Sequence, residues 1–228
     1  MNQNETDKIR LVIIADTHLG HHDILLPDGD ILIVAGDFTE HRQAEIVDFN
    51  NWLGMRPHSH KIIIAGNHDL PVENNPDEAR ELLFNAIYLQ DKCANVMGLS
   101  FYGTPWSPAS GWSFQLEDDR LNEKWRKIPE NIDVLVTHCP PYGILDRSTT
   151  GIHLGCPLLT ENLQRIRPKL HVFGHIHESY GILRKDGTLY ANASICNIKG
   201  QEDNRPIVID WRKNRTIETP KFTELERT

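Results

Sequence analysis

Seven side chains that can bind metal ions follow five short apolar segments of the chain, each at the point where the segment ends. All seven carry oxygen or nitrogen donors, and none is a sulfur donor. They are Asp16, His18, Asp37, Asn67, His138, His175 and His177. A lone histidine or a lone Gly-Asp pair at such a place indicates only a turn or a surface residue. Five such motifs in one chain indicate a metal centre.

The pattern suits a pair of metal ions. Two divalent ions about 3.5–4 Å apart need a carboxylate that bridges them, further donors for each ion and an open position for water. Asp37 follows Gly36 directly and suits the bridging position. Gly66 and Gly174 precede other donors and let the backbone turn closely. An oxygen and nitrogen donor set accepts manganese, iron, zinc or nickel, and we expect two divalent ions, with Mn²⁺ as the first candidate.

The five segments that carry these donors are continuous runs of β-branched residues, which are typical of strands buried on both faces. Open α/β sheets bind ligands beyond the carboxyl ends of their strands, so the five strands would bring the donors to one edge. Between the strands the spacing of apolar residues predicts helices over residues 43–54, 77–86, 116–127 and 157–166.

Turn signals in the second half of the chain predict antiparallel hairpins. Residues 95–97 and 100–102 flank Gly98, and residues 180–183 and 188–191 flank Lys185-Asp186-Gly187. Residues 206–211 form a last strand. We therefore expect an α/β fold in which two β-sheets stack between helices. It would be a single domain over residues 1–228, with polar termini at 1–8 and 212–228.

Composition excludes several classes of protein. The 228 residues include 24 Lys plus Arg and 32 Asp plus Glu, for a net charge of −8, so the chain lacks the basic footprint of a duplex-DNA-binding protein. No apolar run approaches the ~20 residues that span a bilayer, and the N-terminus has no signal-peptide core. The four cysteines form no CxxC pair. We expect a cytoplasmic protein with no membrane partner; its oligomeric state is open.

The motifs resemble the signature of the calcineurin-like metallophosphoesterases. They are Asp16-x-His18, Gly36-Asp37, Gly66-Asn67-His68-Asp69, Thr137-His138 and Gly174-His175-x-His177. Within residues 9–211, the segments THCPPYGILD, GIHLGCPLL, LHVFGHIHESYG, YANASICN and PIVIDW resemble the metallophosphoesterase-domain-containing group, which includes phosphodiesterases that act on cyclic nucleotides. Animal members can carry Gly in place of the first His of the Gly-His-x-His motif, whereas His175 is intact here. The resemblance implies an αββα sandwich.

The resemblance also implies a role for each residue. Asp16, His18 and His177 would hold one metal ion, and Asn67, His138 and His175 the other, with Asp37 bridging both. A hydroxide shared by the two ions would attack phosphorus in line. His68 would be the catalytic histidine at the leaving-group oxygen, and Asp69 would be the carboxylate that orients it. The implied function is a phosphodiesterase for small diesters, with cyclic nucleotides, 2′,3′ or 3′,5′, as the leading substrates.

Three other functions compete with this interpretation. Protein phosphatases of the superfamily, which hydrolyse monoesters, carry Gly-Asp-x-Val-Asp-Arg-Gly, whereas this chain has GDFTEHRQ and Arg42 is out of register. A nuclease is disfavoured by the acidic charge. A non-catalytic scaffold on the same fold would have lost ligands, and none is lost here.

The remaining candidates have weaker signals. Cys139 is expected to pack rather than to act as a nucleophile. Residues 192–194 are candidates for supporting the site. Trp106 and Trp112 could stack on a nucleobase or pack locally. The other histidines noted in the sequence have no partner pattern and are assigned to loops and the surface; they are His21, His22, His41, His58, His60 and His153.

Overall fold

The computed structural model describes residues 8–108, 110–197, 199–201, 203–212 and 216–218. The first sheet consists of β1 (Lys8–Ile14), β2 (Ile31–Ala35), β3 (His60–Ile64), β4 (Ile87–Tyr88), β11 (Ile207–Arg212) and β12 (Ile217–Glu218). The second sheet consists of β5 (Lys92–Val96), β6 (Leu99–Thr104), β7 (Val134–Thr137), β8 (Leu170–Phe173), β9 (Gly181–Lys185) and β10 (Thr188–Asn192). The helices are α1 (Gln43–Gly54), α2 (Leu70–Asn74), α3 (Pro76–Leu82), α4 (Asp118–Arg126) and α5 (Pro157–Ile166), with 3₁₀ turns η1 (Gly20–Asp23) and η2 (His177–Ser179).

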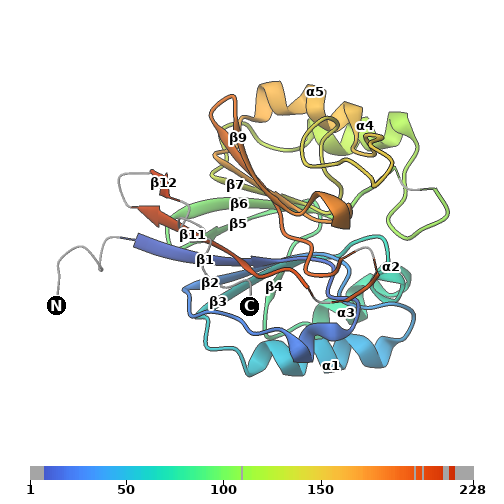
Figure 1. The fold of residues 1–228 in the computed structure, drawn as a ribbon. Coiled ribbons are helices and arrows are strands. Elements are labelled where there is room, and N and C mark those ends of the chain that lie inside the picture. The colour runs from blue at the N-terminus through green and yellow to red at the C-terminus, as the bar shows by residue number, and fades with distance from the viewer. Residues whose placement is uncertain (1–7, 109, 198, 202, 213–215, 219–228) are drawn as a thin grey trace.

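The two sheets lie face to face between two layers of helices (Figure 1). The strand order is β12-β11-β1-β2-β3-β4 in one sheet and β5-β6-β7-β8-β10-β9 in the other. Strands β1 to β4 are parallel, as are β6, β7, β8 and β10, and the remaining strands pair antiparallel at the edges. Helices α1, α2 and α3 cover the first sheet, and α4 and α5 cover the second (Figure 1). The predicted αββα sandwich is confirmed.

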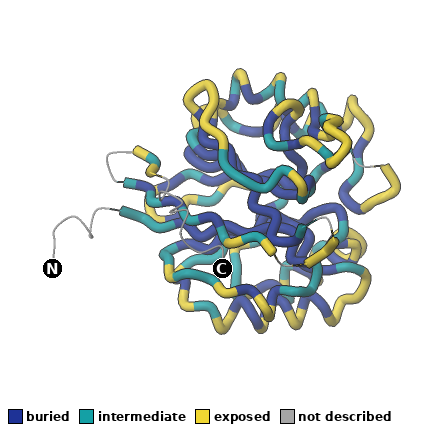
Figure 2. Tube along the Cα trace, in the orientation of Figure 1, coloured by how far each residue is buried: buried dark blue, intermediate teal, exposed yellow. Residues whose placement is uncertain are grey.

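Strand β1 shows why the sequences of the central strands are continuous runs of apolar residues. Leu11 and Ile13 point into the core between the two sheets, and Val12 and Ile14 point into the core beneath the helices. All four are fully buried, because both faces of the sheet are covered. Figure 2 shows the same pattern across the molecule, with buried strands inside and exposed residues on the outer helices and loops.

The helices agree with the predicted ranges in part. Helix α1 buries Ile46, Phe49 and Leu53, the apolar face expected from their spacing. Helix α5 covers the predicted range, and α4 begins slightly later than expected. The predicted helix over 77–86 is too long, because α3 ends at Leu82 and β4 then pairs with β3. The short helix α2, which follows the Asn67-His68 motif, was not predicted.

Both predicted hairpins are present. Met97-Gly98 joins β5 to β6 and Asp186-Gly187 joins β9 to β10, and all four residues have positive φ. Two consecutive residues of positive φ are the signature of the type I′ turn, which matches the twist of a hairpin.

The C-terminal boundary predicted for the polar terminus is wrong. Arg212 is the last residue of β11, and Ile217–Glu218 forms β12 against it, with the Arg212 guanidinium 2.7 Å from the Glu218 carboxylate. At the other end, Lys8 already belongs to β1 and pairs with Asp210. The rest of the predicted termini, residues 1–7, 213–215 and 219–228, lies outside the described residues. None of the described helices is both long and apolar enough to cross a bilayer.

Candidate active site

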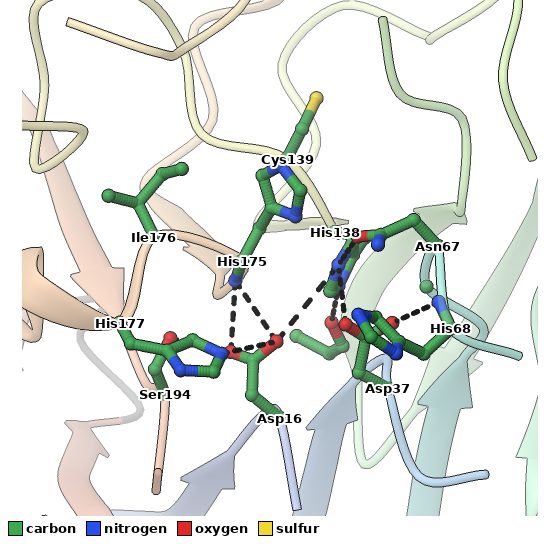
Figure 3. A network of polar contacts seen from close by, with 12 residues as sticks. Asp16, Asp37, Asn67, His68, His138, Cys139, His175, Ile176, His177 and Ser194 are labelled. Carbon is green, nitrogen blue, oxygen red and sulfur yellow. Dashed lines mark hydrogen bonds and ion pairs between the residues drawn. The ribbon is translucent and has the colours of Figure 1, made fainter. Parts of the chain in front are cut away.

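The structure brings all seven predicted ligands to one edge of the sandwich, at the carboxyl ends of β1, β2, β3, β7 and β8. Figure 3 shows this edge with Asp16, Asp37, Asn67, His138, His175 and His177. The first sheet contributes four of them and the second sheet three; they are Asp16, His18, Asp37 and Asn67, and His138, His175 and His177. Because the parallel strands of both sheets end at this edge, donors far apart in sequence become neighbours.

The backbone adopts an unusual conformation where it leaves the strands. Asp16, His18, Asp37 and His175 all have positive φ, between 42° and 70°. This conformation costs about 1–2 kcal/mol for a residue with a Cβ. Strained residues of this kind concentrate at functional sites, where the surrounding fold holds them in place. Here the turn directs each side chain toward the shared edge.

Glycines beside the donors make room for them. A Cβ atom on Gly66 would overlap the Asp37 carboxylate and the His138 ring, and a Cβ atom on Gly174 would overlap the Asp16 carboxylate. Only glycine leaves these carboxylates space at the edge.

The first group of donors consists of Asp16, His18 and His177. The Nε2 atoms of His18 and His177 are 3.4 Å apart, and the Asp16 Oδ1 atom lies 3.8 Å from His177 Nε2. These distances allow the three atoms to bind one ion. The Asp37 Oδ2 atom lies 3.9 Å from His18 Nε2, so it borders this group.

The second group contains Asn67, His138 and His175. The His138 Nε2 atom lies 2.8 Å from Asn67 Oδ1 and 3.3 Å from Asp37 Oδ2. The His175 ring is 5.0 Å from the His138 ring, centroid to centroid. Asp37 therefore borders both groups, as a bridging ligand would.

Three of the histidines are held by their Nδ1 atoms. The Nδ1 atom of His18 lies 2.7 Å from a Glu40 oxygen, that of His138 lies 2.9 Å from the carbonyl of Ala35, and that of His177 lies 3.3 Å from the carbonyl of Asn197. With the Nδ1–H donated to these acceptors, each Nε2 atom faces the carboxylates and is the ring nitrogen that would bind a metal ion. Metal-binding histidines are oriented in this way.

The electrostatics of the edge favour positive charge. Asp16 and Asp37 are buried. Burial opposes ionisation of Asp37, yet His138 and His18 hold the pKa of that carboxyl well below its usual range. Burial likewise opposes protonation of His138, but Asp37 and Asp16 outweigh it and raise the His138 pKa to about 9. Burial, reinforced by His138, lowers the His175 pKa to about 4, so this ring is neutral. The donor set fits two divalent cations.

The partner of His68 differs from the predicted one. The His68 Nδ1 atom lies 2.8 Å from Glu40 Oε2, and the other oxygen of Glu40 contacts His18. The assignment of Asp69 as the orienting carboxylate is wrong. Glu40 was missed by the sequence reasoning, although a carboxylate three residues after Asp37 was visible in GDFTE.

Asp69 holds the backbone instead. Its buried carboxylate accepts hydrogen bonds from the N–H groups of Asp37, Phe38, Thr39 and Gly66, at 2.6 to 3.1 Å, and from the Thr39 hydroxyl. These bonds tie the turn after β2 to the turn after β3. Asp69 faces the backbone because the chain turns into α2 immediately after it.

Residues near the last strand of the second sheet support Asp16. The Ser194 hydroxyl donates to Asp16 Oδ2 at 2.5 Å, and the backbone N–H of His175 donates to the same oxygen at 2.9 Å. The Asn192 side chain donates to the carbonyls of Leu145 and Ile176. The expected support of the site by residues 192–194 is present.

Two of the histidines assigned to the surface are buried, so that assignment is wrong for them. His21 packs against Phe49 and Trp52 of α1, and His58 contacts the carbonyl of Pro27. His21 lies in η1 and His58 lies between α1 and β3, and sequence spacing gives no sign of their contacts with other segments.

Cys139 is buried against the carbonyl of Trp106, and burial raises the pKa of its thiol. The prediction that Cys139 packs rather than attacks agrees with this environment. Trp106 packs locally, with its Nε1–H donated to Asp91 and the Lys124 ammonium 4.2 Å from its ring centroid.

The donors open onto a cavity of about 470 Å³. Its described lining residues are His18, Asp37, Asn67, His68, Trp112, His175, His177, Glu178 and Gly200. This volume is in the range of small-molecule sites.

Comparison with known proteins identifies the family of this chain. The family model described as calcineurin-like phosphoesterase matches residues 9–179. The human metallophosphoesterase domain-containing protein 1 is 43% identical over 229 residues, which cover 88% of this chain and 70% of that protein. The UPF0046 protein C25E10.12 of Caenorhabditis elegans is 40% identical, covering 90% of this chain and 81% of its own length.

A solved structure shares the fold at low sequence identity. The crystal structure of phosphopantetheinyl hydrolase from Mycobacterium tuberculosis superimposes with a TM-score of 0.61 at 16% identity, covering 97% of this chain and 99% of the other. The match of the family model over most of the chain and the identity to curated relatives decide the assignment. The chain belongs to the calcineurin-like phosphoesterase family.

Proposed function

We propose that this protein is a metal-dependent phosphodiesterase that hydrolyses small phosphodiesters, with cyclic nucleotides as the leading substrates and two divalent ions, Mn²⁺ first, as cofactors. The observation that carries the proposal is the arrangement of two donor groups around the shared Asp37, with His68 and Glu40 beside them. The resemblance of the second half of the chain to cyclic-nucleotide enzymes supports the choice of substrate.

A preference for diesters follows from the charges around the cavity. A phosphate monoester carries up to two negative charges at neutral pH, and a diester carries one. Among the described residues that line the cavity there is no Lys or Arg, and Glu178 adds a carboxylate. Arg42, the nearest arginine in sequence to Asp37, instead pairs with Glu45 at 2.9 Å. A monoanionic diester is therefore the better match.

Each residue of the site would have a separate role in the reaction. When bound, two divalent ions supply Lewis-acid stabilisation of the phosphoryl oxygens and lower the pKa of water. The Nδ1 atom of His68 faces Glu40, so its Nε2 is the nitrogen free to donate a proton to the leaving oxygen. The Glu40 carboxylate accepts the hydrogen bond from Nδ1–H of His68 and fixes the direction of the ring. Asp69 would hold the backbone turn after β2 in position, and Ser194 would hold the Asp16 carboxylate in position.

We also propose that the enzyme acts in the cytoplasm. Cys93, Cys139 and Cys156 form no disulfide bond, which is usual in that reducing compartment.

Metal analysis combined with a substrate panel tests the proposal. Purified protein would be stripped with a chelator, reloaded with Mn²⁺ and analysed for metal content and turnover. We expect about two ions per chain, no turnover after stripping and recovery after reloading. Among substrates, a bis-aryl phosphate should show a higher kcat/KM than the matching aryl monophosphate, and 2′,3′- or 3′,5′-cyclic nucleotides should be hydrolysed. Full activity of stripped protein would refute the metal dependence, and a preference for the monophosphate would refute the diester assignment.

A further inference from the structure

Trp112 differs from the other tryptophans of this chain. Trp52, Trp125 and Trp211 are almost fully buried, and Trp106 is held by Asp91 and Lys124. Trp112 is 51% exposed, although an indole ring gains free energy when it leaves water. Its ring lies 4.4 Å from the His68 ring, centroid to centroid, with an interplanar angle of 35°. An exposed indole therefore stands beside the candidate catalytic histidine.

The residues around Trp112 hold it in that place. The N–H of Ser113 donates to the carbonyl of Asn67 at 3.0 Å, and the N–H of Phe114 donates to Glu73 Oε1 at 2.7 Å. The Phe114 side chain is buried beneath the loop. These contacts connect the segment on the C-terminal side of Trp112 to the turn after β3 and to α2. The indole is thus positioned by the same turn that positions Asn67 and His68.

A second cavity also has Trp112 in its lining. It has a volume of about 310 Å³ and shares Asn67, His68 and Trp112 with the first cavity. Its other described lining residues are His41, Leu70, Glu73, Gly111 and Ser113. The two cavities share three lining residues, so they adjoin each other at Asn67, His68 and Trp112, and together they are called the cleft below.

The second cavity has the chemistry of a site for a flat ring. The indole offers an aromatic face, and Leu70, which is 36% exposed, offers a further apolar surface. His41 and Glu73 add polar groups at the lining, where a heteroaromatic ring would present its nitrogen and oxygen atoms. Stacking on an aromatic side chain is available to every nucleobase, because each has a π-face.

We propose that the cleft beside Trp112, lined also by His41, Leu70 and Glu73, is the subsite for the aromatic ring of the substrate, a nucleobase. The inference rests on the proposed phosphodiesterase function and adds the residues that would recognise the base, with Trp112 as the one that determines specificity. The phosphate lies at the metal ligands, and the base lies on the His68 side of the cavity.

Steady-state kinetics on a matched pair of substrates test the proposed ring subsite. The pair is a nucleoside 2′,3′-cyclic phosphate and the methyl riboside 2′,3′-cyclic phosphate, which has the same reacting atoms and no base; if the enzyme prefers 3′,5′ diesters, the corresponding pair is used. For Trp112→Ala we expect KM for the nucleotide to rise roughly 5- to 100-fold, as for the loss of one base stack, and KM for the base-free diester to change less than about twofold. Trp112→Phe should retain most of the nucleotide affinity.

A matched control and a binding experiment complete the test. Phe84→Ala removes another exposed aromatic side chain, 74% exposed, that does not line the cleft, and it should leave both substrates unaffected. Quenching of tryptophan fluorescence by a nucleoside 5′-monophosphate, compared with ribose 5-phosphate, measures ring binding without turnover. Trp112→Ala should abolish the difference between the two ligands.

The outcomes separate the two proposals. Equal losses on the nucleotide and the base-free diester, or an unchanged ligand difference in the fluorescence experiment, would overturn the ring subsite while leaving the phosphodiesterase intact. Failure of the wild-type protein to hydrolyse any diester would overturn the proposed function. In that case the fluorescence comparison still decides whether Trp112 binds a ring.

Discussion

The cluster at the sheet edge and the cluster of His21, His22 and Asp48 both bring imidazole nitrogens close to carboxylates. In the second cluster the Nε2 atoms of His21 and His22 both lie 3.1 Å from one oxygen of Asp48. It joins the turn η1 to helix α1, and Asp48 and His22 are more than half exposed. By residue type alone, either cluster could hold a metal ion.

The difference lies in how the rings are held. At the sheet edge the Nδ1 atoms of His18, His138 and His177 have acceptors behind them, and their Nε2 atoms converge on buried carboxylates. The Nδ1 atom of His21 is buried with no hydrogen-bond partner among the described residues, and burial lowers its pKa to about 4. A metal-binding histidine normally donates its second N–H. The first cluster is built for cations, and the second fastens a loop to a helix.

Substitution of Asp37 should have the largest effect, because this carboxylate borders both donor groups. For Asp37→Ala we expect metal content to fall well below two ions per chain and kcat/KM to fall by more than ~100-fold, the upper range for groups that only support metal ligands. Asp16→Ala, which affects one group, should retain more metal. Near-normal metal content and rate in Asp37→Ala would show that the carboxylate does not bridge.

Substitution of His68 should separate acid catalysis from metal binding. His68→Ala removes the proton donor and leaves the ligand set intact, so we expect both ions to remain. The rate on a cyclic nucleotide, whose ribose alkoxide leaves poorly, should fall about 10²-fold or more. The rate on a nitrophenyl diester, whose leaving group needs no proton, should fall much less. Equal losses on the two substrates would indicate that His68 mainly binds phosphate.

Glu40 should act through its neighbours. Glu40→Gln keeps the shape but removes the charge that supports His68 and His18, and we expect roughly a tenfold loss on cyclic nucleotides. The loss should appear in kcat more than in KM and should be smaller on the nitrophenyl diester, and Glu40→Asp should restore part of it. Asp69→Asn is the matched comparison: it should lower the free energy of unfolding, because Asp69 holds backbone N–H groups. If Glu40→Gln lost stability without this dependence on the leaving group, Glu40 would be structural only.

The smallest effect is expected at the second cluster. Asp48→Asn removes the charge that accepts hydrogen bonds from His21 and His22 and should lower the free energy of unfolding by about 0.5–1 kcal/mol, since the group is half exposed. Metal content and kcat/KM should stay within about twofold of the wild type. Denaturant unfolding and metal analysis measure both quantities. Loss of a bound ion in Asp48→Asn would contradict the distinction between the clusters.

Strand ends were the most informative part of the sequence. Continuous apolar runs ending in Asp, Asn or His predicted both the sheets and the edge at which their donors meet, because parallel strands share the direction of their carboxyl ends. Helix lengths were less predictable: the segment after Pro76 continues the helical pattern, yet helix α3 ends at Leu82, and Ile87 and Tyr88 then pair with β3.

The sequence by itself determined which residue types could bind the metals and in what order the strands deliver them, since these depend on local hydrophobic runs and on motif spacing. Only the tertiary structure decided which carboxylate contacts His68. Asp69 is adjacent in sequence, but its oxygens are taken up by backbone N–H groups, and Glu40 reaches the ring from the neighbouring turn. The same is true of Trp112, whose place beside His68 depends on a loop fastened to the turn after β3. Contacts of this kind join separate loops, and no periodicity along the chain encodes the distance between them.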